Sequence, residues 1–166
     1  FYEDYELRIT VPATFVGSLR MDNGSGDTEI LLTALQDVRL TSGAGEIKTG
    51  DMTTASFSAD NSAGSIVTGS ITAEKDIAME NSAGKISTGA LSAGGKVTLS
   101  SSAGDIVADG LKAASANVRN SAGRTEIHHI EDTDLTARQS AGGIVCQYDS
   151  FAENQMDIEN SAGRIL

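Results

Sequence analysis

The tetrapeptide NSAG occurs at residues 61–64, 81–84, 120–123 and 160–163, and close variants of it fill the intervals between these copies. Its last residue is always glycine. The motif glycines are Gly26, Gly45, Gly64, Gly84, Gly104, Gly123, Gly142 and Gly163. The gaps between them are 19, 19, 20, 20, 19, 19 and 21 residues. A fixed period of about 20 residues is the signature of a solenoid, in which each repeat forms one coil.

Apolar residues recur at fixed places in each repeat and predict strands. Two places after the motif glycine stand Ile47, Ile66, Ile86, Ile106 and Ile144, with Thr28 and Thr125 as exceptions. Apolar pairs spaced by two precede the next glycine: Val38/Leu40, Phe57/Ala59, Ile77/Met79, Val97/Leu99, Ala116/Val118, Leu135/Ala137 and Met156/Ile158. Spacing by two is typical of strands, and no helical spacing recurs. We therefore predict an all-β fold, a single parallel β-solenoid of about 7–8 coils, each of 19–21 residues.

The same alternation places the first motif residue on the inward face of its strand. This column comprises Asn23, Ser42, Asn61, Asn81, Ser101, Asn120, Gln139 and Asn160. Side-chain amides stacked at the spacing of the coils can hydrogen bond to one another, so we predict an asparagine ladder along this corner. The motif glycines are the predicted turn residues, because glycine permits positive φ or a close approach of neighbouring coils.

The ends of the sequence differ from the repeats. Residues 1–21 contain YELRITVPATF (5–15), whose alternating apolar residues predict a lead-in strand that caps the first coil. The repeats follow over residues 22–166, in a single domain. Because the sequence stops soon after a motif, in NSAGRIL, we expect the repeats to be a fragment of a longer array.

Composition excludes several classes of partner. The chain of 166 residues has a net charge of −11, which opposes binding to nucleic acid. No apolar run approaches the roughly 18 residues that a membrane span needs, so we expect no membrane insertion. The single cysteine, Cys146, cannot form a disulfide within the chain.

The start of the sequence and its repeats together resemble a known family. The run LRITVPA (7–13), followed by repeated SAG-x-I units, resembles the adhesin family of short-coil parallel β-solenoids, a domain of unknown function. That family has no established catalytic residues, so the resemblance transfers none. It implies a cell-surface or extracellular location and an interaction role.

The stretch TEIHHIEDTD (125–134) is the most site-like segment. His128 with Glu131, or His129 with Asp132, could share a metal ion if both side chains projected from one turn. Adjacent histidines on a strand point to opposite faces, however. We therefore favour a solvated corner, and expect no metal and no cofactor.

Two other classes are weaker alternatives. A polysaccharide-active β-helix enzyme would need carboxylates gathered across neighbouring coils and aromatic sugar platforms. The carboxylates recur in no single column, and the tyrosines stand only at Tyr2, Tyr5 and Tyr148.

An ice-binding protein would need a continuous threonine array. The column of Thr49, Thr68 and Thr88 continues instead as Ala108, Ile127 and Cys146, and is predicted to face inward.

We therefore expect no catalytic residues and no enzyme, but a structural and adhesive extracellular module that assembles end to end into a fibre. The alternative is a non-catalytic binding or scaffold domain of a larger cell-surface protein. The expected partners are further copies of the chain, through the solenoid ends, and a surface glycan or protein ligand.

Asn23 begins the sequence Asn23-Gly24-Ser25, which is a signal for N-glycosylation. The predicted inward position of Asn23 opposes a glycan. The sequence therefore leaves two alternatives, a glycosylated Asn23 and an inward, unmodified one.

Overall fold

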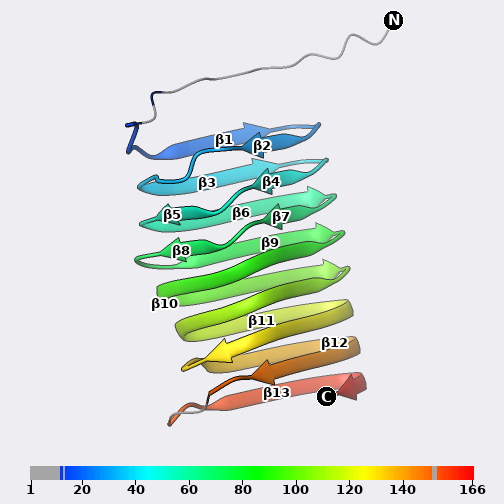
Figure 1. The fold of residues 1–166 in the computed structure, drawn as a ribbon. Helices are drawn as coiled ribbons and strands as arrows, with labels where there is room; N and C mark the ends of the chain where they lie inside the picture. Colours follow the sequence, from blue (N-terminus) through cyan, green and yellow to red (C-terminus); the bar gives the residue numbers. More distant parts are fainter. Residues whose placement is uncertain (1–11, 13, 151–152) are drawn as a thin grey trace, which may run out of the picture.

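The computed structural model describes residues 12, 14–150 and 153–166, and it shows a parallel β-solenoid with no helix in these residues. The chain winds through about eight turns, and each coil lies directly on the one before it (Figure 1). The predicted fold class is therefore confirmed. The predicted lead-in strand over residues 1–21 lies mostly outside the described residues, and the first strand begins at Leu19, inside that range.

The early coils consist of two or three short stretches of strand. The first stretch is β1 (Leu19–Asn23), β3 (Asp37–Ser42), β6 (Ser56–Ala63) and β9 (Ile77–Ala83). The second is β2 (Thr28–Ile30), β4 (Ile47–Thr49) and β7 (Ile66–Thr68). The third is β5 (Met52–Thr54) and β8 (Ile71–Ala73). In the later coils the strands run on through the corners, as β10 (Ile86–Ala103), β11 (Ile106–Glu131), β12 (Asp134–Tyr148) and β13 (Met156–Ile165).

Each strand pairs in parallel with its equivalent in a neighbouring coil. The main order is β1-β3-β6-β9-β10-β11-β12-β13, so β1 and β13 are the edge strands of the described sheet. Equivalent residues of the repeat are direct neighbours: Asn61 pairs with Asn81, and Ile77 pairs with Val97. The sequence period therefore equals one turn of the solenoid.

The core consists of inward columns that run the length of the solenoid. Met52, Ile71 and Leu91 are almost fully buried at one inward position. So are the isoleucines two places after the motif glycine in all coils but the last: Ile47, Ile66, Ile86, Ile106 and Ile144. The apolar pairs of the middle coils are buried as well. The last pair differs, since Met156 is 51% exposed and Ile158 is only partly buried. Their strand, β13, has a neighbour on one side only.

Candidate functional site

The motif corner is a tight turn that excludes side chains from its glycine. All eight predicted turn glycines have positive φ, between 102° for Gly26 and 138° for Gly163. A Cβ on Gly84 would lie 1.9 Å from the carbonyl oxygen of Gly64, in the preceding coil. Glycine is therefore required here twice, for the left-handed backbone and for the close approach of the coils.

The amide column lies inward as predicted, but its hydrogen bonds differ from the prediction. Asn61 and Asn120 are buried, and each amide nitrogen donates to the carbonyl of the motif glycine in the preceding coil. The distances are 2.8 Å for Asn61 to Gly45, 2.8 Å for Asn81 to Gly64, 2.9 Å for Asn120 to Gly104, 2.7 Å for Gln139 to Gly123 and 2.9 Å for Asn160 to Gly142.

The predicted bonds between successive amides are thus replaced by bonds from amide to main chain. The turn directs the glycine carbonyl at the amide of the next coil, and a corner carbonyl must find a donor somewhere. Two coils have serine in this column. Ser42 donates to Ala44 within its own turn at 3.4 Å, whereas the buried hydroxyl of Ser101 has no partner in the described chain.

Asn23, in the first coil, donates to acceptors of its own turn. Its amide nitrogen lies 2.9 Å from the carbonyl oxygen of Gly26 and 3.1 Å from the hydroxyl of Thr28. The nitrogen to which a glycan would be attached is therefore engaged in two hydrogen bonds.

Aspartates form a second set of links between coils, which the sequence reasoning missed. In each, a carboxylate oxygen accepts a main-chain N–H from the next coil at 2.7–2.9 Å. The pairs are Asp27 with Glu46, Asp51 with Ser70, Asp76 with Lys96, Asp105 with Arg124 and Asp134 with Gln155. A possible signal was that Asp27 and Asp105 both directly follow a motif glycine. Part of the negative charge therefore has a structural role at corners.

The site-like stretch at 125–134 forms an irregular corner of β11 and the turn that follows it, and we call residues 128–134 the histidine corner. His129 and Asp132 have φ of 48° and 41°, and are the only non-glycine residues with positive φ in the described chain. The register between β11 and β12 also shifts between Ile127 and Ile130. Such conformations cost about 1–3 kcal/mol each and persist only where the surrounding structure holds them.

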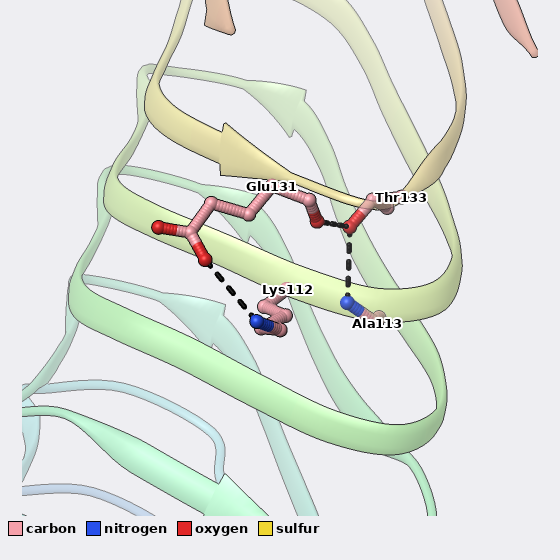
Figure 2. Close-up of polar contacts among 4 residues, drawn as sticks. All are labelled: Lys112, Ala113, Glu131 and Thr133. Carbon is pink, nitrogen blue, oxygen red and sulfur yellow. Dashed lines mark hydrogen bonds and ion pairs between the residues drawn. The ribbon is translucent and has the colours of Figure 1, made fainter. Parts of the chain in front are cut away.

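Thr133 fixes the end of this corner, as Figure 2 shows. Its buried hydroxyl accepts the main-chain N–H of Ala113 at 3.0 Å and donates to the carbonyl of Glu131 at 2.6 Å. Lys112 and the side chain of Glu131 form an exposed ion pair at 3.2 Å across the same two coils. One threonine thus satisfies groups of two successive coils where the turn is irregular.

The histidine corner does not gather a set of metal ligands. The nitrogen Nδ1 of His129 lies 2.6 Å from a carboxylate oxygen of Asp149, in the next coil, so its partner is not Asp132. Glu131 pairs with Lys112, and Asp134 accepts the N–H of Gln155. Among the described residues, no three His, Cys, Asp or Glu side chains lie close enough to hold a metal ion.

Cys146 and Tyr148 lie at the end of β12, beside the histidine corner. Cys146 pairs with Ile127 in the register and is partly buried. Burial raises the pKa of its thiol to about 11, and raises the pKa of Tyr148 to about 12, with smaller contributions from Cys146 and Asp134. At neutral pH Cys146 is therefore a protonated, weakly nucleophilic thiol.

Each coil of this protein pairs in parallel with the adjacent coils, and this stacked arrangement defines its class, the parallel β-solenoids. The chain belongs to the Toastrack family DUF4097, which matches residues 1–166 and is a domain of unknown function with a solenoid-like fold. Comparisons with the curated proteins and with the solved structures gave no match. The family supports the fold that the resemblance implied.

Proposed function

We propose that the chain is a non-catalytic structural and adhesive module, located outside the cell or on its surface, which assembles end to end into a fibre. One observation carries this proposal. The exposed large hydrophobic residues of the described chain all lie near its two ends: Phe15, Val16 and Leu31 near β1, and Met156, Ile165 and Leu166 near β13. The coils between them bury such residues in the core.

The two ends also carry the open strand edges. Within the described residues, β1 and β13 each pair with a strand on one side only, so their other sides have main-chain N–H and C=O groups without a strand partner there. An open edge of this kind is a template for pairing with another strand. Apolar residues beside an open edge make both ends of the rod suited to association.

The sides of the rod suit an adhesive role. A column of exposed serines follows the motif corner, with Ser62, Ser82, Ser102, Ser121, Ser140 and Ser161 one coil apart. Regularly spaced hydroxyls can donate to and accept from a glycan or a protein surface. The location outside the cell rests on the resemblance of residues 7–13 and the repeats to the adhesin family.

A second function, a binding or scaffold domain of a larger surface protein, is favoured by the histidine corner. Backbone strain concentrates at sites that bind ligands, and His129 and Asp132 combine strain with exposure. Loss of ligand capture on substituting this corner, with assembly unchanged, would favour this function.

Sedimentation velocity of the purified chain over a hundredfold concentration range tests assembly. The proposal predicts species that grow with concentration, and one monomeric species at every concentration contradicts it.

Digestion of intact source cells by an added protease tests the location. We expect the protein to be cleaved without cell lysis, and full protection until lysis contradicts a surface location.

A further inference from the structure

The first and last coils are complementary in a way that specifies how copies join. We propose that the last coil of one copy stacks on the first coil of a second copy, head to tail, in the register that relates coils within the chain. This inference rests on the proposed end-to-end assembly and names its partner and geometry.

The inward columns continue across such a contact. The column that begins at Leu19 ends at Met156, and the column that begins at Met21 ends at Ile158. In a head-to-tail stack these apolar side chains would meet as they do between coils. Asn160 would likewise meet Asn23, at the ends of the amide column. The contact would cover Met156, which is exposed in the single chain.

The charges at the two ends are complementary in the same register. Arg164 and Asp27 both directly follow a motif glycine, one in the last coil and one in the first. Arg20 and Asp157 are the first and last members of another column. Stacking would thus form two pairs of opposite charge at the outer surface.

One pair opposes this contact, since Asp22 and Glu159 share a column. Glu159 is already paired with Arg138 of its own chain, at 3.2 Å. The guanidinium group of Arg138 also lies 3.5 Å from the carboxylate of Asp157. The repulsion is therefore partly neutralised, and the opposite pairs outnumber the like pair. Because a head-to-tail contact does not close on itself, it yields filaments and not dimers.

Charge exchange between Asp27 and Arg164 tests this register directly. Arg164→Glu and Asp27→Lys each place like charges at the contact, and we expect each to raise the concentration needed for assembly about tenfold at low salt. A mixture of the two variants restores opposite charges at every contact, as does the double variant D27K/R164E. Both are expected to assemble at the wild-type concentration.

The matched control is Asp105→Lys, which changes the equivalent place in a middle coil and also loses a bond to the next coil. We expect it to leave assembly unchanged in sedimentation, with folding of all variants checked by circular dichroism. Met156→Glu, which puts a charge into the apolar contact, should abolish assembly.

The outcomes separate two failures. If the wild type stays monomeric, both the assembly and the register are wrong. If it assembles but the exchanged charges and Met156→Glu have no effect, the assembly stands and the register is overturned. Closed dimers that do not elongate also overturn the head-to-tail contact.

Discussion

At the motif corner, the glycine and the asparagine have different tasks in the same turn. The glycine lets the chain bend where a Cβ would strike the preceding coil, and the asparagine donates to the carbonyl that this bend exposes. For Gly64 and Asn81 the donor lies 2.8 Å from the oxygen. The motif thus recurs because each copy of it completes the hydrogen bonds of the copy before.

Replacing a motif glycine should be far more costly than replacing a glycine of another corner. Gly84→Ala would force an alanine to a φ of 123° and place its Cβ 1.9 Å from a main-chain oxygen. We expect it to lower the free energy of unfolding by at least about 2–3 kcal/mol. Gly50→Ala is the matched control, because its Cβ would meet no atom within 4 Å. Chemical denaturation of both variants measures the difference, and equal stabilities contradict the role of the turn.

The amide bond can be tested by adding it as well as by removing it. Asn81→Ala should cost about 1–3 kcal/mol of stability, because it leaves the carbonyl of Gly64 without its amide donor. Ser101→Asn should add an equivalent bond to Gly84 and raise the free energy of unfolding by about 1 kcal/mol. Urea denaturation reports both. A destabilised Ser101→Asn variant would show that the coils at this column leave no room for the amide.

The buried thiol of Cys146 makes stability depend on alkaline pH. Its pKa is raised from 9.0 to about 11 in the folded chain. Between these values the unfolded thiol loses its proton while the folded one keeps it, so rising pH favours unfolding. From pH 8 to pH 11 the wild type should lose up to about 2–3 kcal/mol more stability than Cys146→Ala. Denaturant titrations at several pH values measure this difference, and parallel curves for the two proteins contradict it.

At the scale of the coil, the regular strands could be predicted from sequence and the irregular corner could not. Residues spaced by two, such as Ile77 and Met79, face the core in every middle coil, so the period fixes both fold and register. No sequence pattern reports the direction in which a corner carbonyl points. The sequence therefore led us to predict hydrogen bonds between successive side-chain amides, whereas the amides donate to the carbonyls of the motif glycines. The partner of His129 was missed because Asp149 lies a whole coil away in sequence.

The strain at the histidine corner predicts a stabilising substitution. Asp132 holds a φ of 41°, where glycine meets no penalty from a Cβ. Asp132→Gly should therefore raise the free energy of unfolding by about 0.5–1 kcal/mol, and Asp132→Val should lower it by at least about 1 kcal/mol. Thermal denaturation checks both. A loss of stability in Asp132→Gly would show that the carboxylate itself holds the corner.

At the scale of the whole molecule, a solenoid concentrates its unpaired groups at its ends. In the part of the chain that the structure describes, every middle coil has a neighbour on both sides, whereas β1 and β13 have one each. The column register, the exposed apolar residues and the charges at the two ends point to the same head-to-tail contact. The sequence period predicted the coils, but the match between the end coils emerged only once the columns were traced through the structure.

Negative-stain imaging of residues 1–166 tests the central claim, end-to-end assembly, most directly. At low salt and high protein concentration we predict unbranched filaments one solenoid wide, which shorten on dilution and are absent for Met156→Glu. Isolated short rods of one uniform length at every concentration would contradict the account.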